Sequence, residues 1–218
     1  MSLSSLKKTM KARILLIAAV LSASAILTFC PEAGGAAALR PDHFDASFLW
    51  RMATCHLVHW SAEHLFYDGL CFAIIMAMLP IRKSLPCMML ASVSIAIAVT
   101  LAYPDMTAYG GLSGVNCALF ALWALQLAKR SKTVGAMALA AIVSKTLLEI
   151  HAGHTFFVAN AFIPADMAHV AGIISGIIYA ICEKRLPKMI DIAMNHSKFS
   201  ETMDSRPSFT RSYREHLP

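Results

Sequence analysis

The sequence predicts an all-α membrane protein with six transmembrane helices and both termini in the cytoplasm. Three observations support this fold class. Hydrophobic residues make up 57% of the 218 residues and charged residues only 15%, whereas a soluble domain of this length carries about a quarter charged residues. The hydrophobic residues fall in six runs that approach the roughly 20 residues a helix needs to cross a bilayer. Basic residues flank alternate connections between these runs.

The first hydrophobic run, residues 14–29, predicts a helix near residues 12–30. Four basic residues precede it: Lys7, Lys8, Lys11 and Arg13. A basic stretch before an apolar run is also typical of a cleavable signal peptide. Because five further apolar runs follow, we favour a retained first helix, and cleavage is the alternative.

The five further runs predict helices near residues 62–80, 85–102, 112–129, 133–150 and 166–183. Helices are required because backbone that faces lipid must satisfy its own hydrogen bonds. Prolines fall at or near the ends of the runs, as is typical of helix boundaries: Pro80, Pro86, Pro104 and Pro164. We therefore expect one membrane domain over residues 1–188, followed by a polar cytoplasmic tail over 189–218.

Basic residues orient the predicted bundle. They precede the first helix, separate the second from the third and the fourth from the fifth, and follow the sixth: residues 7–13, 82–83, 129–132 and 184–188. Cytoplasmic connections carry an excess of Lys and Arg, so both termini are predicted to be cytoplasmic. The net charge is +6, but because the basic residues lie in short clusters at the ends of apolar runs, we expect no nucleic-acid partner.

The long connection 31–61 is rich in aromatic and polar residues, among them Trp50, Arg51 and Trp60. Trp is favoured where the membrane meets water, so we expect this connection to lie partly in the interface. The six cysteines form no C-x-x-C pair. We interpret them as small buried hydrophobic residues and expect no disulfide or metal site.

Polar residues within apolar helices are costly and are functional candidates by default. His64 and Asp68 are four residues apart, on one face of the second predicted helix. Ser113 lies in a G-G-L-S-G motif at the start of the fourth, and His169 lies in an A-H-V-A-G motif near the start of the sixth. The even-numbered helices all begin on the non-cytoplasmic side, so these groups are predicted at similar depth, where they can converge.

Small residues predict close packing of the fourth and sixth helices. They recur every four positions in the sixth and lie on one side of the fourth: Ala168, Gly172 and Gly176, and Gly114, Ala118 and Ala121. Packing of these faces would bring the His169 imidazole toward the Ser113 hydroxyl. A serine becomes a good nucleophile when a base within about 3 Å takes its proton.

The motifs Y-G-G-L-S-G at 109–114 and A-H-V-A-G at 168–172 resemble the two signature motifs of rhomboid intramembrane proteases. Trp50-Arg51 resembles the Trp-Arg pair of that family's first external loop. His59 and His64 match its paired histidines at the start of the second helix. The resemblance covers roughly residues 50–185 and implies a rhomboid-like six-helix bundle.

The resemblance implies a serine protease with a Ser-His dyad and no third acidic member. Ser113 would attack the scissile carbonyl, and His169 would relay the proton to the leaving amine. The Ser113 backbone N–H and the His64 side chain would hold the oxyanion. Gly110, Gly111 and Gly114 would leave room for the substrate backbone near Ser113. The implied partner is a membrane protein with a single transmembrane helix, and no cofactor or metal is implied.

Asp68 departs from the family pattern, because a typical member has Asn at this place. An ionised carboxylate facing an oxyanion would oppose catalysis. Either burial keeps Asp68 protonated, or Asp68 accepts a hydrogen bond from His64 and keeps that ring charged. We favour the second because the i,i+4 spacing allows the contact.

An Asp at this place in a compact core resembles the rhombosortase subgroup. Its substrates carry a C-terminal Gly-Gly, a single membrane helix and a basic tail. The expected location is a bacterial inner membrane, with the active site facing the periplasm or exterior.

Other interpretations stay open. Ser113 could cap a helix, and His59 is expected to brace the first loop. Lys145 and Glu149 are also four residues apart and are expected to neutralise each other. The alternative functions are a catalytically inactive rhomboid-like protein that binds membrane clients, and a small proton transporter or channel.

Overall fold

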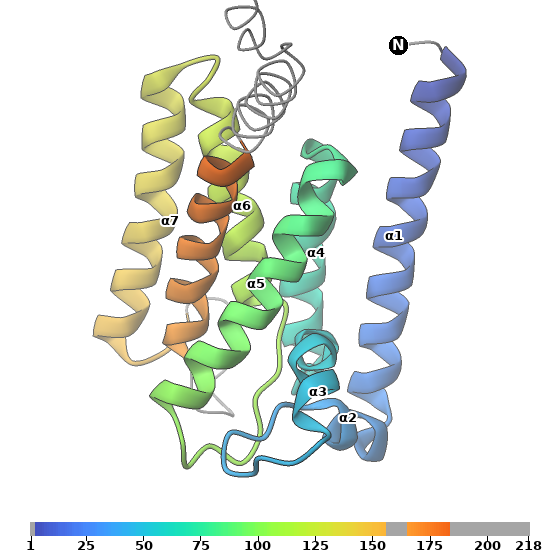
Figure 1. Cartoon of the computed structure of the whole chain (residues 1–218), viewed down its shortest axis with the longest axis vertical. Helices are drawn as coiled ribbons and strands as arrows, with labels where there is room; N and C mark the ends of the chain where they lie inside the picture. The colour runs from blue at the N-terminus through green and yellow to red at the C-terminus, as the bar shows by residue number, and fades with distance from the viewer. Residues whose placement is uncertain (1–2, 156–164, 184–218) are drawn as a thin grey trace, which may run out of the picture. The chain divides into compact units, whose positions relative to one another are not determined.

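Helices account for nearly all the regular structure in the computed structural model, which describes residues 3–155 and 165–183. The long helices are α1 (Leu3–Phe29), α4 (Ala62–Met78), α5 (Ile81–Ala102), α6 (Ser113–Leu127), α7 (Lys132–Ala152) and a final helix, Asp166–Glu183, drawn in orange in Figure 1. The connection between α1 and α4 holds the short helices α2 (Pro31–Ala37), α3 (Phe48–Thr54) and η1 (Cys55–Leu57). The predicted tail 189–218 lies outside the described residues.

Two predicted helix starts differ from the structure. α1 begins at Leu3 rather than near residue 12, because the lysines before the apolar run are good helix formers. α5 begins at Ile81 rather than near residue 85, and Pro86 lies inside it. Pro80 marks that boundary instead, since it is the N-cap of α5 and the preceding Leu79 is extended.

The long helices alternate in direction along the chain. α1, α5 and α7 run toward the end that carries α2 and α3, whereas α4, α6 and the final helix begin there (Figure 1). Three helix N-termini therefore lie at one end of the bundle. Residues 1–180 form one unit, and of the second unit, 181–218, the structure describes only the last turn of the final helix, 181–183.

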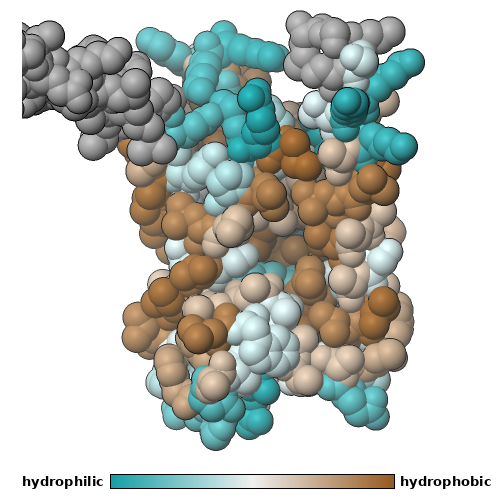
Figure 2. All heavy atoms as spheres, turned by 45° about the vertical axis from the view of Figure 1, so that its right-hand side comes forward, coloured by the Kyte–Doolittle hydropathy of each residue, from teal (hydrophilic) through white to brown (hydrophobic). Residues whose placement is uncertain are grey.

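The outer helices carry the surface of a membrane protein. Four helices within the described residues are long and apolar enough to cross a bilayer: α1, α5, α7 and the final helix. Large hydrophobic side chains such as Leu101, Met137 and Leu147 are exposed on them. On the face shown in Figure 2, brown hydrophobic residues occupy the middle and teal hydrophilic residues gather at both ends. This distribution is that of an integral membrane protein.

α6 is the central helix and is shorter than its neighbours. It packs against α4, α5 and α7, and Val115, Ala118, Leu119 and Leu122 on it are buried. Its 15 residues span about 22 Å at 1.5 Å per residue, less than the ~30 Å of a hydrocarbon core. Because Ser113 begins this short helix, it lies within the thickness of the bundle.

The final helix packs against α6 through glycine at backbone contact distance. A Cβ placed on Gly172 would lie 2.1 Å from the Gly114 carbonyl oxygen, and one on Gly176 would lie 2.2 Å from the Ala118 carbonyl oxygen. Only residues without a side chain permit this approach. The stripe of small residues in the final helix therefore faces α6.

α1 packs against α4, and the cysteines show two environments. The Leu21 side chain lies against Gly69 of α4, and Arg13 Nη1 donates a hydrogen bond to the Ala77 carbonyl at 2.7 Å. All six cysteines are free. The interpretation as buried residues is right for three of them and wrong for the three that are exposed: Cys55, Cys87 and Cys117, and Cys30, Cys71 and Cys182.

Candidate active site

A cavity of about 580 Å³ opens beside the N-termini of α4, α6 and the final helix. Four of the polar residues singled out from the sequence line it: Ser113, His169, His64 and Asp68. α7 contributes Lys145 and Glu149 to the same wall, and Trp60 lines the cavity as well. Polar residues that are far apart in the chain thus share one cavity whose lining is otherwise mostly apolar.

Ser113 is the first residue of α6, and the loop before it is held by backbone contacts. The N–H of Gly111 donates to the Cys55 carbonyl at 3.1 Å, and the N–H of Leu112 points at His59 Nε2 at 3.4 Å. Tyr109 pairs with Leu39 in both directions, at 2.8 and 3.0 Å. The N–H groups of the first turn of α6 have no acceptor within the helix, so they are available to an anion near Ser113.

His169 lies near the start of the final helix and is buried. A Cβ on Gly114 would lie 2.8 Å from the Ala168 carbonyl oxygen, so the residues next to Ser113 and His169 in the chain contact each other. Between the two side chains themselves, the structure shows no hydrogen bond. Catalytic hydrogen bonds often become short only when substrate is bound.

The contact of His169 with α7 was missed by sequence reasoning. Glu149 Oε2 lies 3.3 Å from His169 Nδ1 and 2.7 Å from Lys145 Nζ. The i,i+4 spacing indicated the Lys145 pair, which is present. No sequence spacing links residues 149 and 169, so the acidic residue in an apolar helix was the only available signal.

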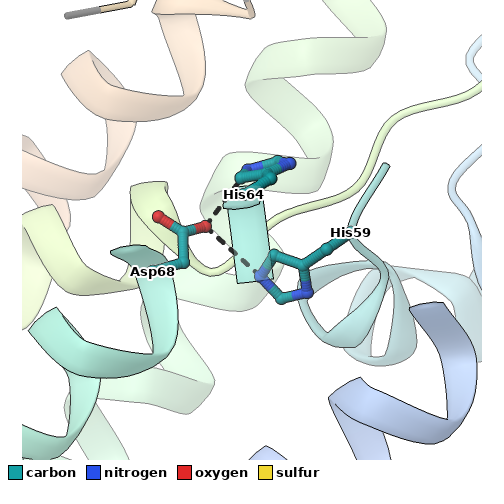
Figure 3. Close-up of side chains that lie close together, drawn as sticks. All are labelled: His59, His64 and Asp68. Atoms are coloured by element: carbon teal, nitrogen blue, oxygen red, sulfur yellow. Dashed lines mark ion pairs between the residues drawn. The ribbon is translucent and has the colours of Figure 1, made fainter. Parts of the chain in front are cut away.

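One carboxylate oxygen of Asp68 contacts two imidazoles, as the dashed lines in Figure 3 show. Its Oδ2 is 3.3 Å from His59 Nε2 and 3.3 Å from His64 Nε2. All three residues are buried. The contact between Asp68 and His64 that the second alternative for Asp68 requires is therefore present, and His59 shares the same carboxylate oxygen.

His59 also joins the first connection to the loop that carries Ser113. Its Nδ1 lies 3.2 Å from the Leu57 carbonyl oxygen, while its Nε2 receives the Leu112 N–H at 3.4 Å. A ring that donates from Nδ1 to a carbonyl has Nε2 as its acceptor. His59 therefore fits a bracing role at the start of α4.

His59, His64 and Asp68 also form a group that could hold a metal ion, since one potential ligand atom from each lies within 4.8 Å of the others. The Leu112 N–H, however, points at the same His59 Nε2 lone pair that a metal would need. The Leu112 N–H thus already occupies one of the three atoms that a metal would need.

Gly111 places His64 beside the nucleophile's loop. Its φ of 141° is in the region that favours glycine, and a Cβ there would lie 3.2 Å from His64 Nε2. Asn116, which sequence reasoning missed, donates from Nδ2 to the Asp68 carbonyl oxygen at 2.9 Å. α4 and α6 are thereby tied together one turn below Ser113.

Trp50 and Arg51 lie in α3, away from the cavity-lining residues. Arg51 Nε donates to the Ala36 carbonyl at 3.1 Å, and its guanidinium carbon is 5.7 Å from the centre of the Trp50 ring. The pair connects α3 to α2 and so stabilises the first connection.

The fold and the cavity define an integral membrane protein with a hydroxyl, imidazoles and carboxylates in one internal site. Residues 46–185, more than half of the chain, match the family model of the rhomboid domain. The chain therefore belongs to the rhomboid family, whose members are generally serine intramembrane proteases. No curated protein matches the chain.

Proposed function

We propose that the chain is an intramembrane serine endopeptidase that cleaves another membrane protein within or beside its transmembrane segment. Ser113 is the nucleophile and His169 the general base. The observation that carries this proposal is that Ser113, His169 and His64, from three helix N-termini, line one cavity.

The proposed reaction follows from these groups. Ser113 Oγ attacks the scissile carbonyl carbon while His169 takes the hydroxyl proton. His169 then donates that proton to the leaving amine, and an acyl-enzyme remains on Ser113. His169 then takes a proton from a water, whose oxygen attacks the ester carbonyl carbon. The bond between that carbon and Ser113 Oγ breaks, the second product leaves as a carboxylic acid, and His169 returns its proton to Ser113 Oγ.

The negative oxygen that forms at each step needs donors. The Ser113 N–H lies at the start of α6, and the His64 ring lies against Gly111. We assign both as oxyanion donors, because charge that develops there meets donors already in place. Loss of one such donor typically costs about 3–4 kcal/mol of transition-state stabilisation.

The proposed substrate is a protein with one transmembrane helix, a C-terminal Gly-Gly and a basic tail, as in the rhombosortase subgroup. Asp68 in place of the usual Asn supports this subgroup. Gly110, Gly111 and Gly114 line or adjoin the approach to Ser113 and favour small residues at the cleaved bond.

We further propose six membrane spans, with α4 and α6 as short central ones. The cytoplasmic side is then the end with the basic connections, such as residues 82–83 and 129–132. The cavity would open to the periplasm or exterior of a bacterial inner membrane.

The test is cleavage of a reporter with one transmembrane helix, a Gly-Gly site and a basic tail, co-expressed with the wild type or with Ser113→Ala. We expect cleavage by the wild type only. A reporter with Gly-Gly changed to Leu-Leu is the control for the subgroup. Equal cleavage with Ser113→Ala would refute the protease assignment, and equal cleavage of both reporters would refute the Gly-Gly preference.

A second candidate function is a catalytically inactive rhomboid-like protein that binds membrane clients. The lack of a hydrogen bond between the Ser113 and His169 side chains is the observation that favours it. A serine-directed fluorophosphonate separates the two, because it labels only an activated serine. Labelling that disappears in Ser113→Ala supports the protease.

A further inference from the structure

The carboxylate of Glu149 in α7 lies against the Nδ1 nitrogen of the His169 ring. We infer that Glu149 positions the His169 ring, an inference that rests on the proposed function. The site is then a Ser113–His169–Glu149 relay, and Lys145 holds its acidic member. This differs from the dyad that the family resemblance implies.

The geometry singles out one carboxylate oxygen. Glu149 Oε2 lies 3.3 Å from His169 Nδ1 and 2.7 Å from Lys145 Nζ. Glu149 is 1% exposed, and all three residues line the cavity that Ser113 lines. The carboxylate therefore sits between a cation and the imidazole, on the cavity side of α7.

The position of Glu149 is costly and calls for an explanation. Its neighbours Leu147, Leu148 and Ile150 are exposed on the apolar surface of α7, and a charged group in an apolar membrane helix is costly. Lys145 offsets the charge, but a pair that served only to neutralise itself has no need of His169. The pairing with Lys145 therefore does not explain why Glu149 also contacts His169.

The chemistry of imidazole supplies the role. A carboxylate beside Nδ1 keeps the ring proton on that nitrogen, so Nε2 carries the lone pair that accepts the Ser113 proton. When the proton arrives, the imidazolium forms beside a negative charge that is already in place. The proton stays on His169 until the leaving amine takes it, and Glu149 remains ionised throughout. The ion pair with Lys145 keeps the carboxylate ionised.

The experiment compares reaction rates in the full-length protein in detergent micelles. The rates are fluorophosphonate labelling of Ser113, which needs no substrate helix, and kcat and KM for the reporter. We expect Glu149→Gln to lower both the labelling rate and kcat about a hundredfold, the lower range of general-base contributions, with KM changed less than about threefold. Glu149→Asp, which retains a carboxylate, should recover to within about tenfold of the wild type.

The matched control is Asp166→Asn. It removes a carboxylate one turn before His169 on the same helix, and the structure shows no ion pair between Asp166 and His169. We expect this variant to label within about threefold of the wild type. An equal loss of labelling rate in Asp166→Asn and Glu149→Gln would overturn the specific role of Glu149. The loss would then follow from removing any negative charge near His169.

Folding of each variant is checked by its thermal unfolding in detergent. If Glu149→Gln does not fold, because Lys145 is left as an unpaired and partly buried charge, the double variant Lys145→Gln/Glu149→Gln replaces it and should label equally slowly. Wild-type labelling rates in the folded Glu149→Gln or double variant overturn the inference and leave the proposed function standing. Absence of Ser113 labelling in the wild type overturns the proposed function as well.

Discussion

At the scale of single residues, Asp68 places one carboxylate oxygen between two imidazoles. His59 and His64 each approach it within 3.3 Å. We propose that Asp68 accepts a hydrogen bond from His64 and that a His64 ring with a proton on each nitrogen donates to the oxyanion. The same Asp that would repel an oxyanion directly can thus assist it through His64.

Asp68→Asn should therefore lower kcat about tenfold, a loss of about 1.4 kcal/mol in transition-state stabilisation. The measurement is reporter cleavage, with Asp105→Asn, a cavity-lining change of the same kind, as control. Unchanged or higher activity in Asp68→Asn would exclude a required charge there. We also predict that the reaction needs no metal, so treatment with a chelator should leave the wild-type rate unchanged.

Gly111 has a backbone conformation that other residues rarely adopt. Its φ is 141°, and a Cβ would lie 3.2 Å from His64 Nε2. Gly111→Ala should cost about 1–3 kcal/mol of stability and lower kcat about a hundredfold, since His64 must shift away from its donor position.

The matched control is Gly153→Ala. Gly153 also has a positive φ, 69°, but a Cβ there meets nothing within 4 Å. We expect a comparable loss of stability in thermal unfolding and full cleavage activity. Equal activity of the two variants would exclude a role for the Gly111–His64 contact.

The folding stability of the protein is expected to depend on pH through the buried His56. Burial lowers the pKa of His56 below its ordinary value of 6.5, and its Nε2 contacts the Ser92 carbonyl oxygen at 3.2 Å. The unfolded chain therefore binds a proton at a higher pH than the folded chain does. The stability contributed by neutral His56 is fully present above about pH 6.5 and is lost as pH falls through the folded pKa.

Thermal unfolding measured from about pH 8 to about pH 5 should show a decline that is smaller in His56→Gln. His43→Gln, which changes an exposed histidine, should decline as the wild type does. Identical curves for the wild type and His56→Gln would contradict this account.

At the scale of elements, the contact of α6 with the final helix sets the distance between nucleophile and base. A Cβ on Gly172 would lie 2.1 Å from the Gly114 carbonyl oxygen, so backbone rather than a mobile side chain would have to move. Gly172→Ala should lower thermal stability and abolish measurable cleavage, because the helix that carries His169 is displaced from Ser113.

Gly176→Ala tests whether position along the helix matters. It creates a similar clash, 2.2 Å from the Ala118 carbonyl oxygen, but one turn farther from His169. We expect a similar loss of stability with a smaller loss of activity. Gly35→Ala, where a Cβ meets nothing within 4 Å, is the control that should change neither. Full activity in Gly172→Ala would refute the link between this contact and the site.

At the scale of the whole molecule, the alternating helix directions place the cavity near one end of the bundle, and the basic connections predict which side of the membrane that end faces. We predict that alkaline phosphatase, which is active only outside the cytoplasm, is active when inserted after Asp105 and inactive when inserted after Ser131. The reason is that residues 129–132 are basic and 103–111 are not. The reverse pattern would place the site on the cytoplasmic side.

The helical fold class, the membrane location and the rhomboid family could all be predicted from the sequence. Hydropathy and the spacing of charges depend only on residues that are close in the sequence, so they can be recognised without the tertiary structure. Boundaries were less accurate. Pro86, expected near the start of a helix, lies inside α5, since a membrane helix tolerates the one backbone hydrogen bond that a proline removes.

The sequence by itself determined that this protein is a helical membrane protein, that polar groups gather near one end of its even-numbered helices, and that glycine stripes allow close packing. Only the tertiary structure decided which groups meet. His59 joins Asp68, and Glu149 contacts His169 across two helices. Such contacts depend on how each helix is rotated and tilted. Packing along the full length of the helices sets that rotation and tilt. No local pattern of residues encodes them.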